Sequence, residues 1–218
     1  MGESDQWDLV DFCRRRFGVE LQPEAMGRIG RFLDLLEVWN RRLRLTGERD
    51  RCTLLRKHVA DAVRCVPLVP QGGSFLDIGT GAGFPGAVVA CVRPDLQTTL
   101  LDAKQRPVSF LGEVIRGVPL TQARAVRLRA EEAADDATLA RSQDLVTSRA
   151  IRIDQFVGLA EPLLAPGGRA ISMQSQATER AVADAVARRA GMRVVAVHDY
   201  DLPDGEPRRL VVMASADG

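Results

Sequence analysis

The stretch from Phe75 to Gly86, FLDIGTGAGFPG, restricts the possible folds of this chain most strongly. It starts within Ser74–Ile78, a segment that is apolar apart from Asp77, as is typical of a buried parallel strand. Three glycines then follow at alternate positions: Gly79, Gly81 and Gly83. Glycine lets a backbone turn sharply against a ligand. Pro85 then favours the start of a helix, whose free N–H groups face an electron-rich group, so the stretch predicts a nucleotide-cofactor loop.

Two classes of nucleotide cofactor use glycine loops of this kind. Gly81, Gly83 and Gly86 fit G-x-G-x-x-G, but in dinucleotide-binding proteins the first glycine directly follows the strand. Here the turn begins at Gly79, and Asp77 precedes it by two residues. That pattern resembles the first motif of the Rossmann-like S-adenosylmethionine methyltransferases. The alternative is that the glycines only make a tight turn, which is common for isolated glycines and uncommon for clusters.

The rest of the chain predicts an α/β fold, because strand and helix patterns alternate from Ser74 onward. We expect seven strands, near residues 74–78, 98–102, 123–128, 144–147, 169–173, 193–199 and 209–214. The predicted fold class is a Rossmann-like class I S-adenosylmethionine methyltransferase fold with a mostly parallel seven-stranded sheet. We expect residues 1–70 to be an N-terminal helical extension, with helices starting near Pro23 and covering 50–66. The methyltransferase domain then covers 71–218.

Candidate site residues follow from this fold, because ligands of such sheets bind beyond the carboxyl ends of the strands. Asp102 ends the second strand and can accept hydrogen bonds from ribose hydroxyls, unless it only forms a turn. Ala130 and Glu131 follow the third strand, and Arg149 follows the fourth. Asp77 can orient the glycine loop through backbone N–H groups and balance the cationic end of a cofactor.

A second candidate pair, His58 and Asp61, borders the apolar stripe of the helix expected over 50–66. A histidine beside an aspartate can do acid and base work, but without further support a packing pair is the favoured interpretation.

Composition limits the class of protein. With 218 residues and 45% hydrophobic residues, the chain can build one α/β domain with an appendage. It contains no apolar run of about eighteen residues and starts with an acidic segment, so we expect a cytoplasmic protein without membrane segments. No metal site is predicted, because the four cysteines lack C-x-x-C spacing and fit reduced core positions: Cys13, Cys52, Cys65 and Cys91.

The charge pattern leaves nucleic-acid binding open. The net charge is only +1, which argues against an avid, free-standing nucleic-acid binder. Lysine occurs only at Lys57 and Lys104, so the positive charge comes from arginine, in clusters at 14–16, 41–56, 124–129 and 208–209. Arginine suits phosphate contacts and base stacking. Each cluster is nevertheless interpreted as a solvated face first and as an RNA contact second.

Several segments together resemble one methyltransferase family. They are LLEVWNRRLRLTG, KHVADAV, FLDIGTGAGFPG, LLDAKQRPVSFL, TSRA and PLLAPGG, spread over residues 35–168. They resemble the RsmG family, also called GidB or glucose-inhibited division protein B. This resemblance implies methylation of N7 of a guanine in the decoding-region loop of bacterial 16S ribosomal RNA, with S-adenosylmethionine as cofactor. The implied cofactor contacts fall on Gly79, Phe84, Ala130, Glu131 and Arg149. The implied partner is 16S ribosomal RNA or the small ribosomal subunit, and we expect a monomer.

The chain also departs from the family pattern, mainly on the expected RNA face. The family usually has N-L-T where Arg44 precedes Leu45 and Thr46, and a serine where Ala62 stands. It has D-S-L-x-K-R where this chain continues from Asp102 with AKQRP. A lysine and a glycine commonly follow its fifth strand, whereas residues 172–176 contain no lysine.

The implied chemistry needs no catalytic dyad. Guanine N7 carries a lone pair and no proton, so positioning and exclusion of water are expected to supply most of the acceleration. Arg149 is the predicted clamp, on guanine O6 or a phosphate but not on N7 itself. Phe84 either packs beside the cofactor or base, or fixes the loop helix to the core.

Three other functions stay open at this point. They are a methyltransferase of the same fold acting on another RNA position or a small molecule, a non-catalytic cofactor-binding or RNA-binding module, and a dinucleotide oxidoreductase.

Overall fold

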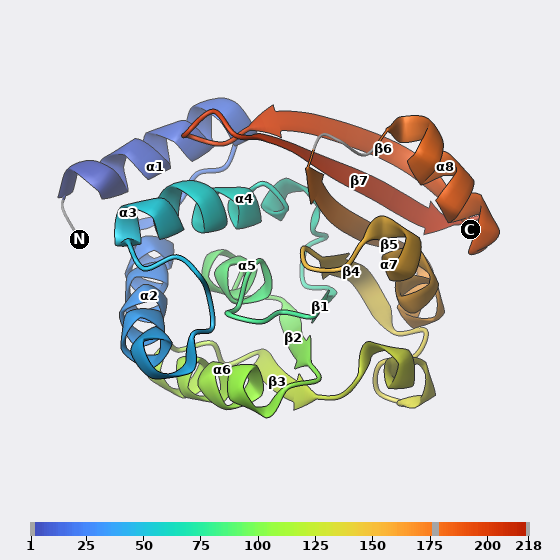
Figure 1. Cartoon of the computed structure of the whole chain (residues 1–218), viewed down its shortest axis with the longest axis horizontal. Coiled ribbons are helices and arrows are strands. Elements are labelled where there is room, and N and C mark those ends of the chain that lie inside the picture. Colours follow the sequence, from blue (N-terminus) through green and yellow to red (C-terminus); the bar gives the residue numbers. More distant parts are fainter. Residues whose placement is uncertain (1–2, 176–178, 217–218) are drawn as a thin grey trace.

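The computed structural model describes residues 3–175 and 179–216, and Figure 1 shows its elements around a central sheet. The regular elements described before the first strand are all helices. Their bounds are α1 Glu3–Phe17, α2 Pro23–Leu43, α3 Arg51–Thr53, η1 Leu54–Val59, α4 Ala60–Val63 and η2 Val66–Leu68. Pro23 is the first residue of α2, so the predicted start of this helix is confirmed.

The helix expected over 50–66 has an irregular middle. Asp50 caps it by accepting a 2.7 Å hydrogen bond from the Thr53 amide. α3, η1 and α4 then follow without a break, and η1 is π-helical, with the Ala60 amide donating to the carbonyl of Leu55. The extra residue in a π turn rotates the side chains before it relative to those after it. His58 lies in this turn.

Seven strands form one sheet in the order β3-β2-β1-β4-β5-β7-β6. Their bounds are β1 Ser74–Ile78, β2 Gln97–Asp102, β3 Ala123–Arg127, β4 Gln143–Ser148, β5 Leu164–Ser175, β6 Met192–Asp201 and β7 Pro207–Ser215. The first five strands run parallel, whereas β7 pairs antiparallel with both β5 and β6. The predicted mostly parallel, seven-stranded sheet is therefore confirmed, with the last three strands longer than expected.

Helices cover both faces of this sheet (Figure 1). α5 Gly86–Val92 and α6 Gln105–Gly117 pack with the N-terminal helices on one face, and α7 Ile153–Ala160 and α8 Arg180–Arg189 pack on the other. In β1, Phe75 packs in the core beside α5, whereas Leu76 and Ile78 pack in the core beside α7. All three side chains are buried, which explains why the strand is an almost continuous apolar run.

Two shorter helices complete the chain. The acidic segment after β3 forms the 3-10 helix η3, Ala130–Asp135. The other, η4, covers Glu161–Leu163. Part of the segment after β5, residues 176–178, lies outside the described residues.

The N-terminal helices share a core with the sheet. Ile29 and Phe32 of α2 belong to the same hydrophobic cluster as Phe110 of α6. At the other side of the molecule, the Phe17 ring at the end of α1 lies 5.7 Å from the Tyr200 ring of β6, edge to face. This packing fits an extension on a methyltransferase domain, and the boundary at residue 70 stays a prediction. None of the described helices is long and apolar enough to cross a membrane.

Candidate active site

A cavity of about 620 Å³ lies at the carboxyl ends of β1, β2 and β4. Five of the residues predicted from the sequence line it: Gly79, Gly81, Asp102, Ala130 and Glu131. Ile78, Leu101 and Ile151 supply apolar surface beside them. Because strands β1 and β4 are neighbours at the point where strand order reverses, this is the place where an open α/β sheet binds its ligand.

The glycine turn forms one wall of the cavity. Gly79, Gly81 and Gly83 all have positive φ, of 71°, 54° and 96°. Residues with a Cβ rarely adopt such angles, so the turn after β1 depends on glycine. The amide of Gly81 donates a 3.0 Å hydrogen bond to Oδ2 of Asp102, and the amide of Lys104 donates to Oδ1 at 2.8 Å. Asp102 thus links the turn to the end of β2, and each carboxylate oxygen keeps a lone pair for a further donor.

Asp77 lies beneath the turn and not on the cavity wall. Its side chain is fully buried, and Oδ2 accepts a 2.9 Å hydrogen bond from the Gly86 amide. Burial is the main effect and raises the pKa of Asp77 to about 7, while the Thr80 hydroxyl and the Gly86 amide act in the opposite direction. Nevertheless, Oδ1 of Asp77 and Oγ1 of Thr80 have no partner of hydrogen-bonding geometry among the described residues. Asp77 is therefore hydrogen-bonded to the first residue of the helix after the turn, and it offers a buried acceptor below the cavity.

Gly83 and Phe84 also lie below the surface of the turn. The Phe84 ring packs edge to face on Phe32 of α2, 5.4 Å away, and stacks on the His58 ring, 4.9 Å away. A Cβ at Gly83 would lie 3.2 Å from Phe32 as well. Of the two interpretations of Phe84, this packing supports the one in which it fixes the loop to the helices.

Arg149 is the predicted residue that the structure separates from the others. It follows β4, and its two neighbours, Ala150 and Ile151, line the cavity. Its own Nε lies 2.9 Å from Oδ2 of Asp61, and its Nη1 lies 2.6 Å from Nδ1 of His58. The two candidates His58 and Asp61 are therefore linked through an arginine 91 residues beyond the first of them.

The chemistry of this cluster excludes His58 as a base near neutral pH. Burial, followed by the positive charges of Arg149, Arg208 and Lys57, lowers the pKa of His58 to about 4. The ring is neutral at pH 7, and its Nδ1 accepts from Arg149, so its proton lies on Nε2. The interpretation of His58 and Asp61 as a packing pair fits this arrangement.

Asp61 is the most buried charge of the cluster, with 1% of its side chain exposed. Burial raises its pKa, and the Arg149 charge and a hydrogen bond from the Tyr200 hydroxyl act against this effect. Asp61 lies among apolar residues in the sequence. Because a buried acid is almost always paired, this position could have indicated that Asp61 has a charged or hydrogen-bonding partner. Its partners, Arg149 directly after β4 and Tyr200 on β6, could not be predicted from the sequence.

Basic residues surround the mouth of the cavity. Four exposed side chains from three separate segments line it, and we name them the basic collar: Arg44, Lys104, Arg106 and Arg129. Arg44 ends α2 with a φ of 50°, a left-handed conformation that turns the chain toward the cavity. The sequence showed these residues within arginine clusters or beside strand ends, but not their convergence.

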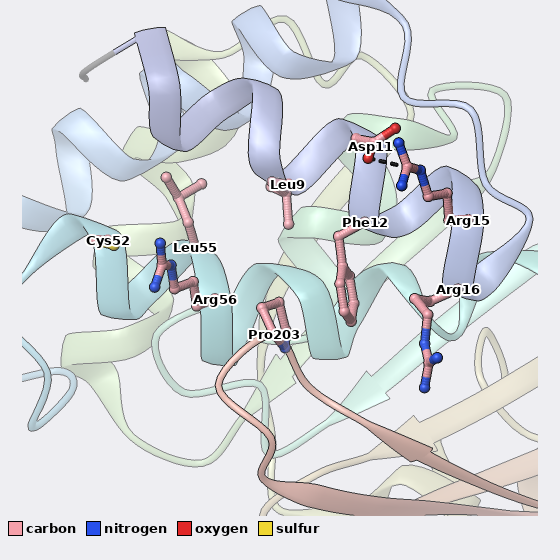
Figure 2. Close-up of a pocket in the computed structure, with 9 residues that line it drawn as sticks. All are labelled: Leu9, Asp11, Phe12, Arg15, Arg16, Cys52, Leu55, Arg56 and Pro203. Carbon is pink, nitrogen blue, oxygen red and sulfur yellow. Dashed lines mark ion pairs between the residues drawn. The ribbon is translucent and has the colours of Figure 1, made fainter.

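A second cavity, of about 400 Å³, lies between α1, η1 and the β6–β7 loop (Figure 2). Figure 2 shows Phe12 and Leu55 facing its interior, Pro203 at its edge, and the Arg15 side chain paired with Asp11. Nε of Arg15 lies 2.8 Å from Oδ2 of Asp11. None of its lining residues comes from the carboxyl ends of β1 to β4. This cavity is therefore separate from the one beside the glycine turn.

The fold is shared with solved methyltransferases. A structure of an S-adenosylmethionine-dependent methyltransferase from Aquifex aeolicus matches with a TM-score of 0.58 and 16% identity, covering 75% of this chain and 93% of that one. A TehB-like methyltransferase from Corynebacterium glutamicum matches with a TM-score of 0.56 and 16% identity, covering 86% and 99%. At these identities the likeness shows the fold alone.

The sheet order, the glycine turn and the carboxylate after β2 define a Rossmann-like S-adenosylmethionine-dependent methyltransferase. The chain belongs to the GidB family, rRNA small subunit methyltransferase G, whose model matches residues 26–207. It is 35% identical over 190 residues to the ribosomal RNA small subunit methyltransferase G of Anaeromyxobacter sp. strain Fw109-5, covering 87% of each chain. It is 35% identical over 210 residues to that of Geobacter sp. strain M21, covering 94% of this chain and 96% of the relative.

The cavity fits the cofactor of this class. Its volume of about 620 Å³ lies within the range of small-molecule sites. Asp102 offers acceptors for ribose hydroxyls, and Ile78, Leu101 and Ile151 offer apolar surface for a purine ring. The unpartnered Oδ1 of Asp77 lies under the turn, where a negative charge favours a cationic ligand.

Proposed function

We infer that this chain transfers a methyl group from S-adenosylmethionine to N7 of a guanine in 16S ribosomal RNA. Family membership over residues 26–207 carries the choice of ribosomal RNA, and the curated relatives are named for the small subunit. The basic collar around the cavity mouth supports an RNA substrate, because exposed arginine and lysine side chains suit phosphate contacts. The N7 position follows from the family resemblance of the sequence motifs.

The roles of the site residues follow from their positions. Bound S-adenosylmethionine supplies a methyl group on a cationic sulfur, and the lone pair of N7 forms the new bond while the carbon–sulfur bond breaks. Asp102 accepts from the ribose, and the Gly79–Gly81 backbone shapes the wall. Asp77 balances positive charge from below. Ala130 and Glu131 bound the purine side of the cavity.

No side chain needs to remove a proton in this reaction. His58 is neutral at pH 7 and its Nδ1 is occupied by Arg149, which agrees with a mechanism that lacks a general base. Arg149 instead donates to guanine O6 or to a phosphate of the substrate, so that the base is held with N7 toward the methyl group.

The setting of the reaction follows from its substrate. We expect the protein to act as a monomer in the cytoplasm, where small ribosomal subunits are found. Light scattering during gel filtration measures the oligomeric state.

Tritiated-methyl transfer to small ribosomal subunits from a strain that lacks this protein tests the proposed function. The expected result is one methyl group per subunit, mapped by mass spectrometry of nuclease fragments to N7 of one guanine. Subunits from the parent strain are the matched control, because their target is already methylated. Label at another RNA position would mean that the protein is an RNA methyltransferase with a different target. Cofactor binding without any methyl transfer would indicate a non-catalytic module.

A further inference from the structure

The environment of Arg149 is more elaborate than an ordinary ion pair. Only 19% of its side chain is exposed, and it forms one ion pair and one hydrogen bond with the α3–η1–α4 helix. The Asp61 carboxylate faces Nε at 2.9 Å, and the neutral His58 ring faces Nη1 at 2.6 Å. A guanidinium is planar and rigid, so fixing two of its nitrogens fixes the direction of the third. Among the described residues, Nη2 has no hydrogen-bond partner, so it is available to a further acceptor.

The acceptors are themselves held in place. The Tyr200 hydroxyl of β6 donates to Oδ1 of Asp61, and Nε of Arg208 in β7 lies 3.8 Å from Oδ2. Arg208 is paired in turn with Glu206 at 2.7 Å. Three separate parts of the chain, the N-terminal helices, the end of β4 and the β6–β7 hairpin, therefore meet around one carboxylate.

His58 also connects Arg149 to the glycine turn. Its ring stacks on Phe84 with an interplanar angle of 27° and a centroid distance of 4.9 Å. Phe84 follows Gly83 directly, so the turn that lines the cofactor cavity and the arginine beyond β4 contact the same imidazole. The His58 ring therefore links the cofactor loop to Arg149.

Burying such an ion pair does not by itself stabilise a fold, because the loss of hydration offsets much of the attraction. A well-packed apolar pair could fill the same volume at no greater cost in stability. Arg149, the cation of this pair, directly precedes two residues of the cavity wall, Ala150 and Ile151. Its location beside the site points to a role in directing Arg149.

We propose that Asp61 and His58 are positioning residues, which hold the Arg149 guanidinium in one orientation so that Nη2 donates to the guanine or phosphate presented for methylation. This inference rests on the proposed function and adds two residues to its machinery. Tyr200 supports the same arrangement from the β6–β7 hairpin, through its hydrogen bond to Asp61.

The first test compares single-turnover methyl transfer to small subunits with calorimetric affinity for S-adenosylmethionine. Asp61→Asn keeps the shape of the side chain and removes its charge. Because small displacements of a clamp strongly affect rate, we expect its rate to fall roughly 100-fold. Its cofactor affinity should stay within about twofold, since Asp61 does not line the cavity. Asp95→Asn, which removes the charge from the Arg93–Asp95 pair elsewhere, is the matched control and should leave both quantities unchanged.

A second pair of variants remains informative if Asp61→Asn does not fold. His58→Asn keeps an acceptor close to the position of Nδ1, whereas His58→Leu fills the site without one. The asparagine variant should retain most of the wild-type rate and the leucine variant should lose about tenfold or more. A merely structural role predicts equal rates in folded samples of both, and that result would overturn the proposal.

Proton NMR of the His58 ring supplies a readout that does not depend on activity. Arg149, Arg208 and Lys57 are the charged groups that act on this ring. Arg149→Gln removes the nearest positive charge, so the pKa of His58 should move upward from about 4. An unchanged His58 titration would show that the two side chains are not in contact in solution.

The outcomes separate this inference from the proposed function. If the wild-type protein transfers no methyl group to small subunits, both the proposed function and the positioning role of Asp61 and His58 are wrong. Wild-type transfer together with an equally fast, folded Asp61→Asn variant would remove only the positioning role. Parallel losses of cofactor affinity and rate in Asp61→Asn would equally contradict it, because they indicate general damage to the site.

Discussion

The carboxylate of Asp77 accepts a 2.9 Å hydrogen bond from the amide of Gly86, which joins the buried strand β1 to the first residue of α5. The two backbones approach so closely that a Cβ on residue 86 would lie 2.7 Å from Oδ2 of Asp77. It would also overlap the side chain of Leu100 in β2. The last glycine of the loop is therefore required by packing between helix and sheet, and not by its backbone angles.

Gly86→Ala should destabilise the protein by about 1–3 kcal/mol, because an extra methyl group overfills this contact. Urea denaturation measures the change. The matched control is Gly158→Ala in α7, where a Cβ would meet no atom within 4 Å. That variant should gain about 0.5–1 kcal/mol from the better helix propensity of alanine. Equal effects of both substitutions would contradict the packing explanation.

The buried Asp77 should make the stability of the free protein depend on pH. Its pKa is about 7 in the folded protein and near 3.8 when exposed, so the folded state binds a proton that the unfolded state releases between these values. The contribution of Asp77 to stability is therefore present at pH 4 and lost as the pH rises toward 7. Denaturation of wild type and Asp77→Asn across this range isolates the effect, since the difference between their curves should change sharply only in this window.

Substitutions of Asp102 and Arg149 should have different effects, the first mainly on affinity for S-adenosylmethionine and the second mainly on the turnover of methyl transfer. Asp102→Ala removes acceptors at the cavity wall and should weaken S-adenosylmethionine binding about 10- to 100-fold, as expected for hydrogen bonds to a charged group. Arg149→Ala should reduce turnover at saturating cofactor more than it changes affinity. Titration calorimetry and methyl-transfer rates measure the two effects, and Asp136→Ala, on an exposed turn, is a control for the first. Unaltered affinity in Asp102→Ala would exclude the ribose role.

The rate of methyl transfer should be flat between about pH 6 and 8 at saturating cofactor. His58 keeps the same neutral protonation state throughout this range, because burial and its cationic neighbours lower its pKa to about 4. The rate should fall only as the pH approaches that value, when a protonated ring would repel Arg149. Single-turnover rates across pH 5 to 9 provide the measurement. A limb near pH 6.5 that disappears in His58→Asn would instead identify His58 as a base.

The basic collar should determine how RNA binding depends on salt. Replacing Arg44, Lys104, Arg106 and Arg129 by glutamine should weaken binding to small subunits and reduce the slope of log affinity against log salt. Each lost phosphate contact should reduce the slope by about 0.7–0.9. Glutamine variants of Arg14, Arg15 and Arg16 in α1 form the matched control, since Asp11 already pairs with two of these arginines. A slope that changes equally in both sets would place the RNA elsewhere.

The main parts of the fold could be predicted because they depend on local pattern. The apolar run of β1 and the glycines after it identified the strand and its turn, and Asp102 was located by its place at the end of β2. The number of strands and their mostly parallel direction followed from the class of fold that these motifs indicate.

The cluster around Arg149 could not be predicted, because it depends on tertiary contacts. The π turn of η1 sets the direction of His58, and nothing in LLRKHV distinguishes it from a regular helix. The pairing of Asp61 with Arg149 and Tyr200 joins residues from three distant segments. Such side-chain pairs depend on how distant segments pack together, and local periodicity in the sequence predicts only secondary structure.

Asp61 and Tyr200 are 139 residues apart in the chain, yet they share a hydrogen bond. At the usual pace of translation, synthesis of the intervening chain takes on the order of ten seconds. During that interval the N-terminal helices, the glycine turn and β4 have emerged, while the hairpin that supports Asp61 has not. A nascent chain can therefore shape the cofactor pocket before it can orient its arginine, so the enzyme becomes competent only once its last two strands have left the ribosome that made it.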